Sequence, residues 1–359
     1  MAALRRRYRG RGDGADRPGD MVDILSAMEP RHDGRVTIYD VAAAAGVAPS
    51  TVSRTFTRPG RVSAATAAHV REVAARVGYP SKDRAEAPAS ARMLAALVSD
   101  IGNPFYAGIF RGAQLTAADA GYEVMLLDTR ESGRRERSVL ERVLPLVDGV
   151  VVASSRMPDA SLRVVGRKVP LILVNRELRG LPSIASDNAG GVREAMDHLR
   201  DQGHGQVVYV HGPEAAWSDG IRAAAVRDAA AALGMEATTI GPFLPTFEGG
   251  WAAAIQLGRR GPSSVIAYND LMAIGLLQGL RSLGRAAPRD VSIVGFDDIP
   301  AGRLLTPALT TVAPPARALG AGAVADLLAR ISGTRPPEPP ARLLPTRLIV
   351  RGTTGPARG

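Results

Sequence analysis

Residues 36–79 read VTIYDVAAAAGVAPSTVSRTFTRPGRVSAATAAHVREVAARVGY, and their pattern predicts three short helices. Thr37 and Asp40 have the spacing of a capping box, in which a hydroxyl and a carboxylate three residues later bond the free N–H groups at a helix start. Pro49 suits the first position of a second helix, because that position leaves its N–H unbonded in any case. Ser63 can cap a third helix. Three helices in so short a stretch predict a helix-turn-helix head.

The positive charge of the chain is concentrated near its beginning. The 359 residues carry a formal net charge of +10. Residues 1–35 hold +2 and residues 36–92 hold +4, so the long remainder of the chain holds only +4. This distribution predicts a DNA-binding head on a near-neutral body.

The composition excludes several classes of protein. Cysteine is absent, which excludes disulfides and thiolate metal sites and suits a reducing cytoplasm. No apolar run approaches the roughly 18 residues of a membrane span, and MAALRRRYRGRGDG at the start lacks the apolar stretch of a secretory signal. The five histidines show no metal-ligand spacing, and there is no Walker loop or GxSxG elbow. We therefore expect a cytoplasmic protein that is no enzyme and needs neither metal nor cofactor.

The chain divides by composition into four parts. Residues 1–34 are rich in Arg, Gly and Asp, and we interpret them as a disordered arm or as an upstream extension from a wrongly chosen start codon. Residues 35–80 form the predicted head. Residues 81–92, SKDRAEAPASAR, are small and polar and predict a linker. Residues 93–359 form the predicted core.

The core alternates short apolar runs with helical segments, which predicts an α/β fold of parallel sheets covered by helices on both faces. Its length could divide into two similar lobes with a cleft between them, and ligands of such folds lie at the carboxyl ends of the strands. The expected strands are 94–98, 124–127, 150–152, 171–174, 207–210, 265–267 and 291–294, and the expected helices include 109–120, 191–202, 222–233 and 271–283.

Residues 36–79 resemble the DNA-binding head of the lactose-repressor (LacI) family of bacterial transcription regulators almost position for position. The core agrees with that family in NPFYAGI, VDGVVV, SDNAGG, HLRDQGH, YNDLMAIG, PRDVSIVGFDD, LTPALTTV and RGTTG. The resemblance covers residues 36–359. It implies a dimeric repressor whose two-lobed, periplasmic-binding-protein-like core binds a small effector, commonly a sugar.

The second predicted helix, Pro49–Thr57, would be the recognition helix in the major groove. Pro49 and Ser50 fall where the family reads bases, although Pro49 offers only apolar contact and Ser50 discriminates weakly. Arg54 can present a bidentate fork to guanine, or else contact a phosphate or solvent. Phosphate anchors are expected at Thr37, Thr51, Ser53 and Arg61.

The linker departs from the family, whose linkers typically carry an Arg-x-Leu-like segment that wedges a leucine into the minor groove. Here Ala87 or Pro88 stands at that position. Pro88 is apolar and could wedge, but it disfavours helix at Ala87 and removes a backbone donor. We expect this regulator to bend its operator less than its relatives do.

Asp270 is the leading candidate for effector binding, because it follows the strand 265–267 at a strand-to-helix turn. A carboxylate there could accept hydrogen bonds from sugar hydroxyls. Alternatively, Asn269 and Asp270 could cap the helix that begins at Leu271, and both roles are compatible. Arg222 matches a family arginine, and its alternative is a surface ion pair. The other candidates are Ser218, one turn before Arg222; Phe105 and Tyr106, as a stacking floor or ordinary core; and Asn175, after a strand.

Asp297 and Asp298 are adjacent, so on a strand they would face opposite ways, and we interpret them as structural rather than as a catalytic pair.

The sequence thus predicts a repressor with a small effector, most simply a sugar, that binds a pseudo-palindromic double-stranded operator as a homodimer and has no membrane partner. Two rival classes are a solute-binding protein of a sugar transport system and a sugar- or nucleoside-processing enzyme. The helix-turn-helix weighs against the first, and the missing catalytic constellation weighs against the second.

Overall fold

A computed structural model describes residues 36–57, 62–77, 79, 92–258, 261–334 and 341–358. The described residues divide into two units, with the boundary between Ala89 and Ser90: a head within residues 36–79 and a core within residues 92–358. In the described ranges, no helix is both long enough and apolar enough to cross a lipid bilayer.

The head consists of the three predicted helices, α1 (Ile38–Ala45), α2 (Pro49–Thr57) and α3 (Ala64–Arg76). The Asp40 carboxylate accepts a hydrogen bond from the backbone N–H of Thr37 at 2.7 Å, as a capping box requires. Gly46 ends α1 with a left-handed φ of 66°. The helices meet in an apolar core that includes Val41, Val52, Val70 and Val73.

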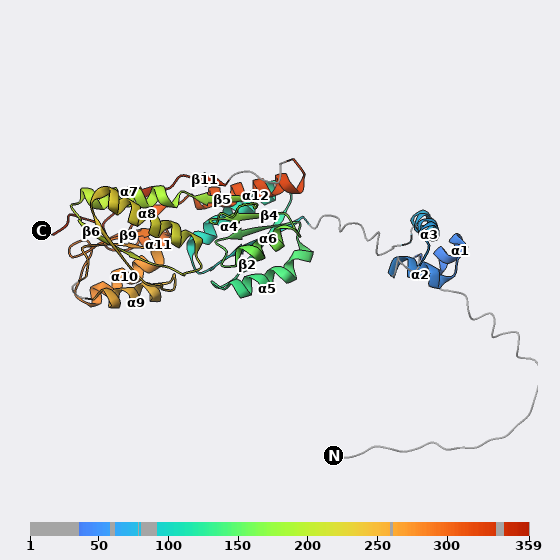
Figure 1. The fold of residues 1–359 in the computed structure, drawn as a ribbon, viewed down its shortest axis with the longest axis horizontal. Coiled ribbons are helices and arrows are strands. Elements are labelled where there is room, and N and C mark those ends of the chain that lie inside the picture. Colours follow the sequence, from blue (N-terminus) through green and yellow to red (C-terminus); the bar gives the residue numbers. More distant parts are fainter. Residues whose placement is uncertain are drawn as a thin grey trace, which may run out of the picture. The chain divides into compact units, whose positions relative to one another are not determined.

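The core contains two lobes, each with one six-stranded sheet (Figure 1). Lobe 1 has the strand order β11-β5-β4-β3-β1-β2, and all its neighbouring strands are parallel. Helices α4 and α12 cover one face of this sheet, and α5 and α6 cover the other. The elements of lobe 1 are β1 (Met93–Val98), α4 (Pro104–Asp119), β2 (Glu123–Asp128), α5 (Gly133–Val143), the short 3-10 helix η2 (Leu144–Leu146), β3 (Gly149–Ala153), α6 (Asp159–Gly166), β4 (Leu171–Val174), β5 (Ser183–Ser186), α12 (Ala316–Ile331) and β11 (Arg342–Leu344).

Lobe 2 repeats this plan with the order β12-β10-β9-β8-β6-β7, in which only β12 runs antiparallel to its neighbour. Helices α9 and α10 cover one face, and α7 and α8 cover the other. Its elements are α7 (Asn188–Asp201), β6 (Gln206–Val210), α8 (Trp217–Leu233), β7 (Glu236–Ile240), α9 (Phe247–Leu257), β8 (Ser264–Ala267), α10 (Asp270–Ser282), β9 (Ser292–Phe296), α11 (Pro300–Arg303), β10 (Thr310–Ala313) and β12 (Arg347–Ile349).

The chain passes between the lobes three times, from β5 to α7, from β10 to α12 and from β11 to β12. Lobe 1 is therefore completed by α12 and β11, which come from the far end of the chain. Helix α12 packs closely on α4, where a Cβ at Gly320 would lie 1.9 Å from the carbonyl oxygen of Ile109. The predicted α/β class, parallel sheets and two lobes are confirmed.

Candidate functional site

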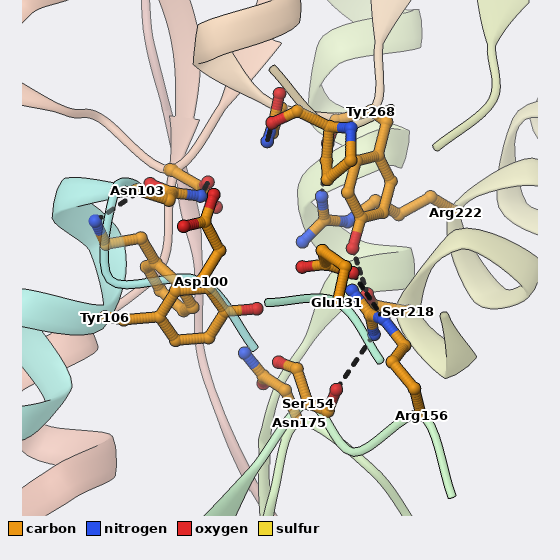
Figure 2. A pocket seen from close by; sticks show the side chains of 14 residues that line it. Asp100, Asn103, Tyr106, Glu131, Ser154, Arg156, Asn175, Ser218, Arg222 and Tyr268 are labelled. Atoms are coloured by element: carbon orange, nitrogen blue, oxygen red, sulfur yellow. Dashed lines mark hydrogen bonds and ion pairs between the residues drawn. The ribbon is translucent and has the colours of Figure 1, made fainter. Parts of the chain in front are cut away.

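A cleft between the two lobes, partly open to solvent, lies at the carboxyl ends of the strands of both sheets (Figure 2). This is the edge at which open parallel sheets bind ligands. Lobe 1 contributes Asp100, Asn103, Phe105, Tyr106, Glu131, Ser154, Arg156 and Asn175, and lobe 2 contributes Ser218, Arg222, Pro245, Tyr268, Asn269 and Asp297.

Five of the six candidate effector residues line this one cleft. They come from three elements or loops far apart in the sequence: Phe105 and Tyr106 from α4, Asn175 from the loop after β4, and Ser218 and Arg222 from α8. Figure 2 shows the Tyr106 and Tyr268 rings entering the cleft from opposite lobes. Their direct contact with an effector remains a prediction.

Helix α4 sets the position of the two aromatic rings in lobe 1. Asn103 caps the helix by accepting a hydrogen bond from the Phe105 N–H at 3.0 Å, and Pro104 occupies the first helical position. The Phe105 and Tyr106 rings lie edge to face with their centroids 5.4 Å apart. Burial raises the pKa of Tyr106, so its hydroxyl keeps its proton and can donate to a ligand.

Arg222 is held by uncharged groups, so the alternative of a surface ion pair is wrong. Its side chain is buried, and its Nε donates to Asn188 Oδ1 at 2.9 Å. Its Nη1 donates to the carbonyl oxygen of Tyr268. The guanidinium carbon lies 3.4 Å from the ring centroid of Phe296, which fixes the plane of the charge.

The structure corrects the prediction that Asp270 contacts the effector. Asp270 is fully buried and does not line the cleft. One carboxylate oxygen accepts the Thr311 hydroxyl at 2.6 Å, and the other accepts the backbone N–H of Ile299 at 2.8 Å. The capping alternative is confirmed for Asn269, whose side-chain oxygen accepts the Met272 N–H at the start of α10 at 2.9 Å, and is wrong for Asp270 alone. Asp270 therefore stabilises the loop after β9 from the buried side, without lining the cleft.

Asp297 is the carboxylate of lobe 2 that faces the cleft, although the sequence pattern suggested a structural role for it. The alternation of a strand does not apply, because β9 ends at Phe296 and Asp297 has a φ of 120°. Burial raises the pKa of Asp297 to about 6, against the opposing effects of the Arg222 charge and of a hydrogen bond from Asn103. Its neighbour Asp298 points elsewhere and pairs with Arg303 and Arg351.

Asn175 turns its carbonyl oxygen away from the cleft. That oxygen accepts hydrogen bonds from the backbone N–H and the hydroxyl of Ser186, at 2.9 and 3.0 Å. The side-chain NH₂ group is thereby left as the part of Asn175 that can serve the cleft, and it acts only as a donor.

Arg156 is the cationic residue of lobe 1 that the sequence analysis missed. Its side chain is only 3% exposed, and its Nε donates to Glu131 Oε2 at 2.7 Å. Its Nη1 donates to the carbonyl oxygen of Ser154 at 2.9 Å. The available signal was its place just after the apolar strand β3, at the same sheet edge as Asn175. Tyr268, just after β8, could have been found in the same way, and its hydroxyl lies 3.2 Å from Ser218 Oγ.

Charge is nearly balanced across the cleft. Two arginines, Arg156 and Arg222, stand against three carboxyl groups, Asp100, Glu131 and Asp297. Donors and acceptors from both lobes surround two tyrosine rings. Such a lining can hold a small molecule that carries several hydrogen-bonding groups and no large net charge.

On the head, helix α2 presents the predicted reading residues. Ser50, Ser53 and Arg54 are exposed, and Pro49 and Thr51 are half-buried. Val52 and Thr55 face the apolar core, where the Thr55 hydroxyl donates to the Thr51 carbonyl at 2.9 Å.

The other predicted DNA contacts differ in what the structure describes. Thr37 is exposed at the start of α1, and Tyr39, which the sequence analysis did not single out, is 68% exposed beside it. Arg61 and Pro88 lie outside the described residues.

Comparisons with known proteins agree with this architecture. The family described as "Bacterial regulatory proteins, lacI family" matches residues 37–81, and the "Periplasmic binding protein-like domain" matches residues 196–354. The HTH-type transcriptional repressor CytR of Escherichia coli (strain K12) is 32% identical over 337 residues, covering 90% of this chain and 98% of CytR. The regulator CelR of Thermobifida fusca is 32% identical over 343 residues, covering 90% of this chain and 99% of CelR.

Solved structures give the same result. A CelR–cellobiose complex has a TM-score of 0.67 and 30% identity, covering 89% of this chain and 100% of that one. A lac repressor dimer bound to operator and an anti-inducer has a TM-score of 0.68 and 25% identity, covering 89% of this chain and 99% of that one. The family match at the head and the relatives that extend along nearly the whole chain lead to one conclusion: this chain belongs to the lacI family of bacterial regulatory proteins.

Proposed function

We propose that this chain is a cytoplasmic transcriptional repressor that binds operator DNA through its head and is controlled by a carbohydrate effector in the interlobe cleft. One observation carries the proposal: both lobes supply hydrogen-bonding groups and a tyrosine ring to the same cleft. The related CelR structure with cellobiose and an Enterococcus faecalis family member with bound ribose support a sugar as the effector.

The cleft residues can act as different hydrogen-bond partners for a ligand, some as donors and some as acceptors. Arg222 donates and Asp297 accepts, so together they can bond neighbouring hydroxyls of one ring. The Asn175 amide donates from the opposite lobe. A ligand bonded to both lobes favours the arrangement of lobes in which all these bonds form, and it changes DNA affinity only as far as its affinities for the two arrangements differ.

The head reads the operator through α2. Arg54 is one turn after Pro49 and Ser50, and all three lie on a helix whose other face is buried in the head. We assign base contacts to Pro49, Ser50 and Arg54. We assign phosphate contacts to Thr37, Thr51 and Ser53, which position the helix without reading sequence.

A homodimer supplies the second head that a pseudo-palindromic operator needs. We assign its interface to an apolar stripe on lobe 2, which consists of Leu244 and the α9 residues Phe247, Trp251 and Ile255. The four side chains are between 37% and 66% exposed. The helical residues recur every fourth position, so they form one face, while the opposite face of α9 packs on α10. The lac repressor dimer among the structural neighbours supports a second copy as the occupant.

The proposal is tested by gel shift with DNA from the protein's own promoter, in parallel with a thermal-shift screen of sugars. We expect a specific complex whose affinity falls steeply as salt increases. We also expect a sugar that stabilises the protein, by about 2.7 kcal/mol at a hundredfold excess over its dissociation constant, and that changes operator affinity. Sugar binding without any DNA binding would instead indicate a solute-binding protein.

A further inference from the structure

Helix α5 carries a buried carboxylate that the effector cleft does not use directly. The buried face of this helix consists of Glu136 and the apolar side chains of Val139, Leu140 and Val143. Glu136 is only 2% exposed and does not line the cleft. A carboxylate in such surroundings is costly unless its oxygens are hydrogen-bonded. The partners of its two oxygens therefore indicate what this charge does.

Both oxygens of Glu136 bond one short loop, residues 154–157, which follows β3. Its Oε1 accepts the Ser155 hydroxyl, and its Oε2 accepts the backbone N–H of Arg156 at 2.9 Å. A Cβ at Gly133, in the first turn of α5, would lie 2.6 Å from the Arg156 carbonyl oxygen. The loop is therefore held against α5 by two hydrogen bonds and by close backbone packing.

The backbone of this loop is strained where it leaves the strand. Ser154 has a left-handed φ of 52°, which residues other than glycine rarely adopt. Its carbonyl oxygen accepts the Ser99 hydroxyl at 2.7 Å and Arg156 Nη1 at 2.9 Å. Ser154 and Arg156 both line the cleft (Figure 2). The turn at Ser154 and the direction of the Arg156 side chain therefore depend on each other.

The Arg156 guanidinium is held by other groups than its backbone is. Its Nε donates to Glu131 Oε2 at 2.7 Å, and its Nη1 donates to the Ser154 carbonyl oxygen. Among the described residues, none accepts a hydrogen bond from Nη2, so this atom can donate to a molecule in the cleft. Glu131 thus directs the guanidinium, whereas Glu136 fixes the backbone from which the side chain extends.

We propose that Glu136 is a positioning residue of the effector site, which holds the loop 154–157 so that Arg156 presents its guanidinium to the cleft. Glu136 acts through Arg156 and does not touch the effector. The consequence for effector affinity rests on the proposed function, whereas the effect on the position of Arg156 does not.

Two substitutions of Glu136 separate its hydrogen bonds from its charge. Glu136→Gln keeps both bonds, because the amide oxygen can accept the Arg156 N–H and the amide NH₂ can donate to the Ser155 oxygen. Glu136→Ala keeps neither bond. Glu141→Ala is the matched control, because it removes another carboxylate of α5, whose side chain is 60% exposed and pairs with Arg137.

The first measurement needs no effector. NMR of the full-length protein with isotopically labelled arginine reports hydrogen exchange at each protected Nε–H, and the Arg156 signal is assigned by its absence in Arg156→Ala. We expect Glu136→Ala to speed exchange at Arg156 Nε about tenfold or more, because the loop opens locally. Glu136→Gln and Glu141→Ala should stay within about threefold of wild type.

Arg222 is the internal reference for this measurement. It is buried in lobe 2, where its Nε donates to Asn188, and its exchange rate should not change in any of the variants. Unchanged exchange at Arg156 in Glu136→Ala overturns the proposal. Equal acceleration at Arg156 and Arg222 also overturns it, because the substitution would then have lowered the stability of the whole core.

The second measurement is titration calorimetry with cellobiose and ribose, the sugars bound in the related structures. For a sugar that binds wild type, Glu136→Ala and Arg156→Ala should each weaken binding about tenfold, and the double variant should lose no more than Arg156→Ala alone. Glu136→Gln should stay within about threefold. Operator binding without sugar serves as the check of folding.

The outcomes separate this inference from the proposed function. A further loss of sugar affinity in the double variant overturns the positioning role, because Glu136 would then act by another route than Arg156. A loss in Glu136→Gln as large as in Glu136→Ala overturns it too, because the charge and not the two hydrogen bonds would matter. Failure of both sugars to bind wild type counts against the carbohydrate effector, and hydrogen exchange at Arg156 then decides the role of Glu136.

Discussion

Asn103 of lobe 1 donates a hydrogen bond from its Nδ2 to Asp297 Oδ2 of lobe 2, across 3.1 Å. The same Asn103 side chain caps α4 through its oxygen. One amide thus joins the start of α4, which carries Phe105 and Tyr106, to the cleft carboxylate of lobe 2. We therefore expect the protonation state of Asp297 to affect both effector binding and the contact between the lobes.

Effector affinity should fall as the pH decreases through about 6. Burial raises the pKa of Asp297 to about 6, so above that pH the group is a carboxylate that accepts hydrogen bonds, and below it the group gains a proton and loses an acceptor. Titration calorimetry at pH 7.5 and pH 5 should show roughly a tenfold loss, which corresponds to about 1.4 kcal/mol. Asp297→Asn should bind weakly at both pH values. An affinity that varies equally with pH in wild type and Asp297→Asn would contradict this role.

Asp270→Ala should lower stability and leave effector affinity almost unchanged. The substitution leaves the Thr311 hydroxyl and the Ile299 N–H without their buried acceptor, at a cost of about 2 kcal/mol or more. Urea unfolding measures the free energy, and calorimetry measures the affinity. Asp297→Ala is the matched control, because it should lose effector affinity and keep most of its free energy of unfolding. A stable Asp270→Ala protein that no longer binds effector would restore Asp270 as a ligand.

Arg54→Ala should weaken operator binding by about 1–3 kcal/mol and relax the preference at one base pair of each half-site. Ser53→Ala should weaken binding to all sequences about equally, because its expected partner is a phosphate. Gel shifts on operators with single symmetric substitutions distinguish the two. If Arg54→Ala weakens every operator by the same factor, Arg54 contacts a phosphate.

Trp251→Glu should convert the dimer into monomers and reduce operator affinity, because it places a charge in the centre of the apolar stripe. Light scattering measures the mass, which we expect to be that of a dimer for wild type. Leu146→Glu changes another exposed apolar residue, in η2 of lobe 1, and should remain dimeric. A tetramer mass for wild type, or a dimer for Trp251→Glu, would refute this assignment.

The fold could be predicted from the sequence because its signals are local. The capping pair Thr37 and Asp40, Pro49 at a helix start, and runs such as 171–174 each act within a few residues, and the structure confirms these elements. Strands such as β7 (EATTI) and β11 (RLL) were missed, because they lie at or near sheet edges and lack a continuous apolar run.

The site was harder to predict than the fold because it depends on where a loop turns after a strand. Asp270 and Asp297 both follow strands of lobe 2, and their residue type alone does not separate them. Asp270 lies three residues beyond β8, inside the first turn of α10, and faces Thr311. Asp297 follows β9 directly, and its positive φ turns it into the cleft. Arg156 was missed because its position in the cleft depends on an ion pair with Glu131, which is distant in sequence.

The three passages between the lobes also determine when each part of the protein can be completed during synthesis. The head has all its helices by Arg76, whereas the sheet of lobe 1 waits for β11 and its covering helix α12, at the end of the chain. A ribosome that releases the chain early would yield a head joined to an incomplete core. Such a product would keep the DNA-reading helix α2 but lack the helix and strand that complete lobe 1, so effector control requires the last part of the chain.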